Sequence, residues 1–321
     1  MALRGASKQT LDTPFVDVQP SRMRMTVTAI CGLALLPGAG SAQAPAWADL
    51  WRVAEGTLVR PAALAGGPTG MFWNPAAVAS AHGPAFGVDV YQTPDVVNVS
   101  SVLLGAGLGL WRRAGVGVLA GRASVGDLVR TTTSPIVDGP EIPVYAQFAG
   151  AVAGVRVGPL EGGVTVLFHD ARLDALGTGG VTLDLGVRVR PLRGLTIGAA
   201  THLGEPAATG GAASGYLGGI EYDFGIPPVI RLPSRLQLRY GIATRKRVST
   251  DHVGSVGLLL SERLLIDAGV HWTGGYGMGS WQPVIGVAFQ AGPFRVGIAR
   301  GSGASDIGAT YRITLGVNGA P

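Results

Sequence analysis

Apolar and polar side chains alternate along residues 181–190 with little interruption. In an extended strand Val181, Leu183, Leu185, Val187 and Val189 fall on one face, and Thr182, Asp184, Gly186, Arg188 and Arg190 fall on the other. The first face suits hydrocarbon and the second suits water, so we expect Leu185→Arg to be costly and Gly186→Ser to be tolerated. A strand in a soluble sandwich also alternates. The recurrence of the pattern and the lengths of the connections therefore have to separate the two classes.

The same alternation recurs through the rest of the chain and predicts fourteen strands. Residues 234–244 and 306–317 repeat it clearly, whereas glycines interrupt it in 97–110. The predicted strands are 84–92, 97–110, 114–123, 143–157, 163–169, 180–190, 194–202, 215–224, 234–244, 252–260, 263–273, 281–290, 293–300 and 306–317.

The connections between these strands alternate in length. Every second one is a predicted tight turn, at 112–113, 159–162, 191–193, 261–262 and 291–292. Those between are longer, at 124–142, 170–179, 203–214, 245–251, 274–280 and 301–305, with a short hairpin at 93–96 and a long Pro-rich link at 225–233 as exceptions. Short periplasmic turns and longer outer loops are typical of membrane barrels. Residues 84–321 are therefore predicted to form an all-β, transmembrane antiparallel barrel of about fourteen strands, with both termini in the periplasm.

Composition supports a membrane location. The chain has 321 residues, of which 47% are hydrophobic and only 14% charged, and 52 are glycine. No apolar run beyond the N-terminus reaches the roughly 20 residues that a membrane helix needs. The net charge of +5 is too small to indicate a nucleic-acid partner.

Residues 1–44 have the pattern of a signal peptide with an N-terminal extension. Arg22 and Arg24 form the basic region, residues 27–36 the apolar core, and Ser41-Ala42-Gln43-Ala44 a small-residue cleavage site. Met23 or Met25 is a better initiator than Met1. The only cysteine, Cys31, lies in the apolar core, so we expect the exported chain to need no disulfide.

Residues 45–83 are not strand-like and contain the run Phe72, Trp73, Asn74, Pro75 and Ala76 among clustered Gly and Pro. Asn74 suits the cap of a helical turn, with Pro75 at its first position. Trp-Asn-Pro-Ala ahead of a Gly-rich, alternating β region resembles the N-terminal hatch of the PorV/PorQ proteins and of the wider FadL-like outer-membrane barrels. The motif covers about 15 residues, and the rest of the resemblance is one of pattern. The alternative interpretation is a loop with a buried tryptophan.

A fourteen-stranded barrel encloses more volume than its own inward side chains can fill. Residues 45–83 are the available plug, as the resemblance also implies. The inward positions carry both charge signs, so they either pair with one another around water or line a pathway for amphipathic solutes. The candidate lumen residues are Asp89, Gln147, His169, Asp184, Arg188, Arg190, Glu221, Asp223, Arg235, Arg239, Asp267, His271, Arg295 and Arg312.

Two functions follow from the resemblance. The first is passage of hydrophobic or amphipathic small molecules across the bacterial outer membrane, as in FadL-like proteins. The second is a structural role in a type IX-like secretion apparatus, as in PorV-like proteins, with secretion subunits as partners. In both, outer-membrane lipid and lipopolysaccharide would surround the barrel. The five histidines are dispersed and no nucleophile, metal or cofactor motif accompanies them, so no enzyme, metal or cofactor is expected.

Overall fold

The computed structural model describes residues 46–94, 97–110, 113–130, 141–203, 215–245, 249–274, 280–302 and 308–318. The predicted signal peptide, residues 1–44, lies outside these ranges. None of the helices within them has the length and apolar content needed to traverse a bilayer.

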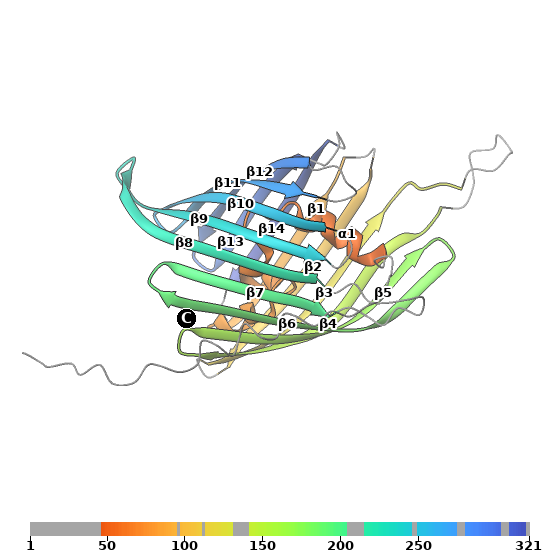
Figure 1. Ribbon diagram of the computed structural model, residues 1–321, viewed down its shortest axis with the longest axis horizontal. Helices are drawn as coiled ribbons and strands as arrows, with labels where there is room; N and C mark the ends of the chain where they lie inside the picture. Colours follow the sequence, from red (N-terminus) through yellow and green to blue (C-terminus); the bar gives the residue numbers. More distant parts are fainter. Residues whose placement is uncertain are drawn as a thin grey trace, which may run out of the picture. The chain divides into compact units, whose positions relative to one another are not determined.

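Fourteen antiparallel strands form a closed barrel in which each strand pairs with its neighbours in sequence and β1 pairs with β14 (Figure 1). This confirms the predicted fold class and strand number. The strands are β1 (Pro84–Gln92), β2 (Val99–Leu110), β3 (Ala114–Val125), β4 (Val144–Val157), β5 (Leu160–Leu173), β6 (Leu176–Leu192), β7 (Leu195–Leu203), β8 (Gly215–Val229), β9 (Leu232–Arg245), β10 (Ser249–Leu260), β11 (Leu264–Thr273), β12 (Ser280–Ala291), β13 (Phe294–Ser302) and β14 (Ala309–Asn318).

Two predicted connections between β4 and β6 are wrong. The turn expected at 159–162 is formed by Gly158 and Pro159, so residues 160–162 already belong to β5. The longer loop expected at 170–179 is the end of a tall hairpin, in which only Asp174 and Ala175 turn. Glycines at 177, 179 and 180 hid this strand in the sequence, because they lack the side chains that give a strand its pattern. Backbone pairing across the hairpin does not need those side chains.

The Pro-rich link expected at 225–233 is also wrong. β8 runs on to Val229 and β9 starts at Leu232, so the turn is short, like the others at that end of the barrel. The register between β8 and β9 shifts between Ile226 and Val229, on either side of Pro227 and Pro228. Proline has no N–H to donate to a strand ladder and is tolerated at such irregularities. With this correction the short-turn end is more regular than the sequence indicated.

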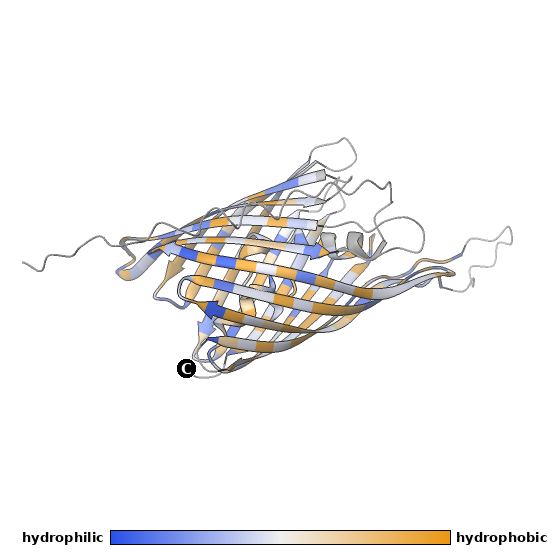
Figure 2. Ribbon diagram, turned by 60° about the horizontal axis from the view of Figure 1, so that its bottom comes forward, coloured by the Kyte–Doolittle hydropathy of each residue, from blue (hydrophilic) through white to orange (hydrophobic). Residues whose placement is uncertain are grey.

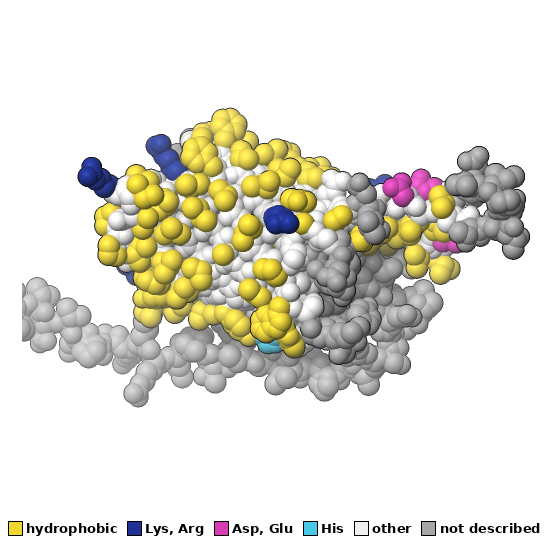
Figure 3. Space-filling view, turned by 90° about the horizontal axis from the view of Figure 1, so that it is seen from above, with side chains coloured by type: hydrophobic (Ala, Val, Ile, Leu, Met, Phe, Trp, Pro, Cys, Tyr) yellow, Lys and Arg dark blue, Asp and Glu magenta, His cyan; other side chains and the backbone are white. Residues whose placement is uncertain are grey.

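The outer surface of the barrel is apolar. Hydrophobic and hydrophilic residues alternate along the strands (Figure 2), and hydrophobic side chains gather over much of the described face seen in Figure 3. Apart from Phe168 and Tyr240, which lie nearer the middle of their strands, the exposed aromatic rings of the described residues lie toward both ends of this band, as in the aromatic girdles at the two membrane interfaces. Those toward the long connections are Tyr216, Trp281 and Tyr311, and those toward the short turns are Phe86, Tyr222, Phe289 and Phe294.

Residues 46–83, called the N-terminal segment below, lie inside the barrel (Figure 1). Their elements are α1 (Ala46–Glu55), η2 (Ala62–Leu64), α2 (Gly67–Gly70) and η3 (Pro75–Ser80). α1 contacts β4 and β5, η2 contacts β7 and β8, and η3 contacts β3 to β6. The segment therefore touches much of the inner wall before the chain enters β1.

Inward-facing glycines make this close approach possible. At eleven of them, among the described residues, an added Cβ would lie less than 3.0 Å from an atom of the N-terminal segment. They are Gly105, Gly109, Gly115, Gly121, Gly154, Gly163, Gly186, Gly198, Gly219, Gly241 and Gly286. The high glycine content thus reflects a wall that has to lie directly against a second layer of chain.

Candidate functional site

Asn74 fixes the centre of the N-terminal segment. Its Oδ1 accepts a hydrogen bond from the Ala76 amide at 3.0 Å, and Pro75 takes the first position of η3, as the sequence predicted. Its Nδ2 donates to the carbonyl of Ala63 at 2.5 Å, which ties η3 to η2. Asn74 is fully buried, and a Cβ on Gly186 of β6 would collide with its Oδ1 and with Pro75. The expected tolerance of Gly186→Ser is therefore wrong.

The aromatic pair of the segment is covered by protein. Phe72 stacks on Phe148 of β4 with ring centroids 4.6 Å apart, and Trp73 meets Phe72 edge-on at 4.8 Å. Trp51 of α1 packs on both phenylalanines at 5.1 Å. These rings supply the apolar contact that Phe72 needs inside a polar lumen. Trp51 and Phe148 belong to no motif, so neither could be selected from the sequence.

Arg188 of β6 holds the N-terminal segment from the wall side. Its side chain is 5% exposed and pairs with Glu161 of β5 at 2.9 Å. The same guanidinium donates to Ser80 Oγ at 2.6 Å and, over longer distances, to the carbonyls of Ala65 and Ala76. Arg190 and Arg156 also pair with Glu161, at 2.9 and 2.5 Å. Glu161 was missed because the sequence placed it in a turn.

A second network joins the segment to the opposite part of the wall. Arg239 of β9, 2% exposed in its side chain, pairs with Glu221 of β8 and Asp267 of β11, both at 2.7 Å. Glu221 also accepts from Arg60 of the segment at 2.6 Å. Burial lowers the pKa of Arg60; Glu221 opposes this, while the cations of Arg239 and Arg295 add to it. Arg60 therefore brings a partly exposed positive charge to the edge of a cavity.

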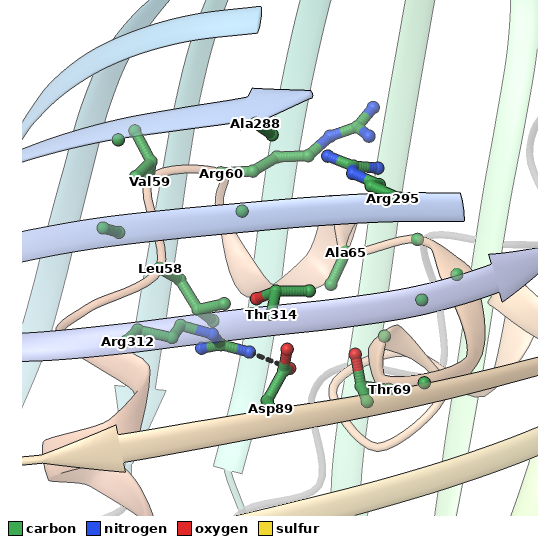
Figure 4. Close-up of a pocket in the computed structure, with 18 of the residues that line it drawn as sticks. Leu58, Val59, Arg60, Ala65, Thr69, Asp89, Ala288, Arg295, Arg312 and Thr314 are labelled. Carbon is green, nitrogen blue, oxygen red and sulfur yellow. Dashed lines mark hydrogen bonds and ion pairs between the residues drawn. The ribbon is translucent and has the colours of Figure 1, made fainter. Parts of the chain in front are cut away.

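This cavity, of about 190 Å³, lies between the N-terminal segment and the wall formed by β11 to β14 and β1 (Figure 4). Arg312 and Asp89 form an ion pair on its floor, and the guanidinium groups of Arg60 and Arg295 lie side by side at its other edge (Figure 4). Arg295 forms no ion pair or hydrogen bond with another described residue. Val59, Ala288 and Ala299 provide apolar surface. The cavity thus combines an apolar wall with an uncompensated cation.

The other predicted lumen residues are distributed around the wall. Asp184 pairs with His202 at 3.0 Å, and His271 Nε2 lies 2.7 Å from the carbonyl of Leu58 in the segment. Arg235 pairs with Asp223 at 2.8 Å and is half exposed near a short turn. Arg190 is similarly exposed, and His169 is buried on β5.

The inward placement of Gln147 is wrong. Gln147 precedes Phe148, whose ring packs inside the barrel, so it points outward. There it accepts from Arg122 at 3.2 Å and donates to Asp170 at 3.0 Å. The Gly-Ala run that follows in β4 carries no polar alternation that could have set the register.

Across the described parts of the chain, no three His, Cys, Asp or Glu side chains come together in a way that could hold a metal ion.

A scan against models of known protein families finds no match, and no curated protein matches the sequence. Solved structures do match. CymD, described as a monoaromatic hydrocarbon channel, gives a TM-score of 0.52 at 13% identity over 83% of this chain and 95% of its own. A FadL homologue from Pseudomonas aeruginosa gives 0.49 at 10% identity, over 83% and 98% of the two chains. The toluene transporter TodX from P. putida gives 0.46 at 11% identity, over 79% and 94%. The likeness to CymD shows that the two proteins share a barrel fold.

Proposed function

We propose that this protein lies in the bacterial outer membrane and lets hydrophobic or amphipathic small molecules pass through its barrel, with the N-terminal segment as a hatch. One observation carries the proposal. The segment packs tightly against β2 to β9 and touches β11 and β12 through Leu58 and Val59, but it leaves the cavity of about 190 Å³ beside β11 to β14 and β1. The fold shared with CymD, which is described as a monoaromatic hydrocarbon channel, agrees with it.

The difference in clearance between the two sides supports a pathway along β13 and β14. Gly297 and Gly316 face the lumen there, but the atoms nearest to an added Cβ belong to the wall, at 3.5 and 3.8 Å. On β5 and β6, by contrast, an added Cβ would strike Pro75 and Asn74 of the segment. Solute would therefore move beside the N-terminal segment on one side only.

Uptake of toluene by a host that lacks its own outer-membrane hydrocarbon channels tests this function. The protein should raise the initial uptake rate several-fold, because a lipopolysaccharide surface slows apolar solutes. Gly297→Phe should abolish the gain by filling the cavity, whereas Gly254→Phe should not, since no atom lies within 4 Å of a Cβ at Gly254. Uptake no faster than in the empty host, with a folded barrel present, would rule out this function.

The PorV-like scaffold is the other candidate from the sequence. It predicts co-purification of the protein with secretion subunits from native membranes, whereas a transport protein should be isolated alone or with bound apolar solute.

We also propose that residues 1–44 are a cleaved signal peptide. N-terminal sequencing of the exported protein should then begin near Pro45.

A further inference from the structure

The cavity beside the N-terminal segment has an excess of positive charge. Arg239 and Arg60 share Glu221 and Asp267, and Arg312 is paired with Asp89, so these cations are matched by carboxylates. Arg295, on the same cavity, is exposed and adds one more guanidinium without a carboxylate from the described residues. A single negative charge would balance it, whereas a doubly charged phosphate would overcompensate it.

Several buried polar atoms at this cavity lack partners among the described residues. Trp73 Nε1 and Arg60 Nε are unpaired donors, and Asp89 Oδ1 is an unpaired acceptor. Trp73 and Asp89 are each only 4% exposed. Buried polar groups are nearly always hydrogen-bonded in native proteins. Unpaired donors next to an unbalanced cation therefore point to a ligand that brings oxygen atoms.

The size and walls of the cavity restrict the rest of this ligand. A cavity of about 150 Å³ lined by apolar side chains holds a benzene molecule, and this one measures about 190 Å³. It is smaller than the roughly 300–1,000 Å³ of pockets that take drug-sized ligands, which favours a compact ligand. Val59, Ala288 and Ala299 offer an apolar surface for a compact body.

We infer that this cavity binds a small aromatic carboxylate, with its carboxylate held by Arg295 and Arg60 and its ring against the apolar wall. The inference rests on the proposed function, because the cavity is the proposed solute pathway, and it names a solute class beyond uncharged hydrocarbons. Planar guanidinium groups suit a carboxylate, since two parallel N–H donors match its two oxygens. The solute would thus be selected by its charge as well as by its apolar surface.

Calorimetric titration of the full protein in lipid nanodiscs with benzoate at neutral pH tests the inference, with benzamide as the uncharged isostere. Nanodiscs avoid detergent, which could fill the cavity. Arg295→Gln should weaken benzoate binding at least about tenfold, as expected for loss of a hydrogen bond to a charged group. Binding of benzamide should stay unchanged, and Arg295→Lys should restore part of the affinity for benzoate.

Arg300→Gln is the matched control, because Arg300 lies on the same strand with its side chain on the outer face. It should bind benzoate like the parent protein. Equal affinity for benzoate and benzamide, or equal loss in Arg295→Gln and Arg300→Gln, would overturn the inference. Toluene uptake would be unaffected by that failure, so the result is separable from a failure of the proposed function.

Discussion

At the scale of single residues, the inner wall is shaped more by missing side chains than by charged ones. Gly186 illustrates this, because its position in the alternation predicts only that it faces inward. The absence of a Cβ there lets Asn74 and Pro75 approach the β6 backbone. Such a contact pairs residues more than 100 positions apart, so a single sequence without its fold contains no local signal for it.

Gly186→Ala should therefore loosen the N-terminal segment. The added methyl group overlaps Asn74 and Pro75, and overpacking of this kind costs about 1–3 kcal/mol. We expect a higher open-channel current in planar bilayers than for the parent protein. Gly254→Ala, where the methyl group meets no atom within 4 Å, is the control and should leave the current unchanged. If both variants behave alike, the close packing of the segment on β6 is wrong.

Leu185 tests the opposite face of the same strand. It is exposed on the outside of the barrel, so Leu185→Arg should lower the free energy of unfolding by about 2–4 kcal/mol if the residue lies at the bilayer midplane. Urea titration in lipid vesicles measures this, with Leu185→Ile as the control of similar volume. An arginine tolerated as well as the isoleucine would place Leu185 away from lipid.

At the scale of elements, alternation was sufficient to find every strand but not to find where strands end. In the middle of the bilayer, the outward positions of each strand have to be apolar, whereas the inward positions can be polar or small. This requirement produces the alternation seen in the sequence. Beyond the bilayer the alternation disappears. The glycines near the turn between β5 and β6 and the prolines of β8 were therefore predicted to lie in loops, although they belong to strands. The cap at Asn74 was predictable because a helical turn is a local structure. Its bond to Ala63 and the partners of Arg188 depend on tertiary contacts.

Asn74 should hold the elements of the N-terminal segment together. Asn74→Ala removes the cap of η3, worth about 0.5–2 kcal/mol, and leaves the buried Ala63 carbonyl without its donor, at a further cost of about 1–3 kcal/mol. We expect faster cleavage of the segment by an added protease in reconstituted protein. Asn74→Asp keeps an oxygen that can cap but loses the donor to Ala63. A cleavage rate close to that of the alanine variant would identify the bond to Ala63 as the more important one.

At the scale of the whole molecule, residues 46–83 lie inside the barrel, but their asymmetric packing could not be predicted. The sequence indicated inward charges of both signs around the lumen, which would either pair with one another or line a solute pathway. In the structure the N-terminal segment packs most closely on β2 to β9 and touches β11 and β12 only through Leu58 and Val59 among the contacts described above, so the free volume lies beside β11 to β14. Arg60 and Arg295 come together there from the segment and from β13 (Figure 4). Neither the size of the cavity nor the position of Arg60 has a counterpart in strand alternation, because both result from how the segment folds within a closed wall.

Deletion of residues 62–79 tests whether this segment gates the barrel. It removes η2, α2 and all of η3 except Ser80 but no strand, so the barrel should still assemble and shift its gel mobility on heating. A fourteen-stranded barrel without its plug should contain a continuous aqueous channel, so we expect a several-fold rise in conductance in planar bilayers and loss of the preference for hydrophobic solutes. Replacement of the same residues by a Gly-Ser linker of equal length is the control that keeps α1 tethered, and it should conduct similarly because a flexible linker cannot pack on the inner glycines.

If the segment only filled space in a secretion scaffold, the deletion would reduce retention of partner subunits more than it changed solute flux. Unchanged conductance in a correctly folded deletion variant would remove the hatch, and with it the principal argument for transport through the barrel.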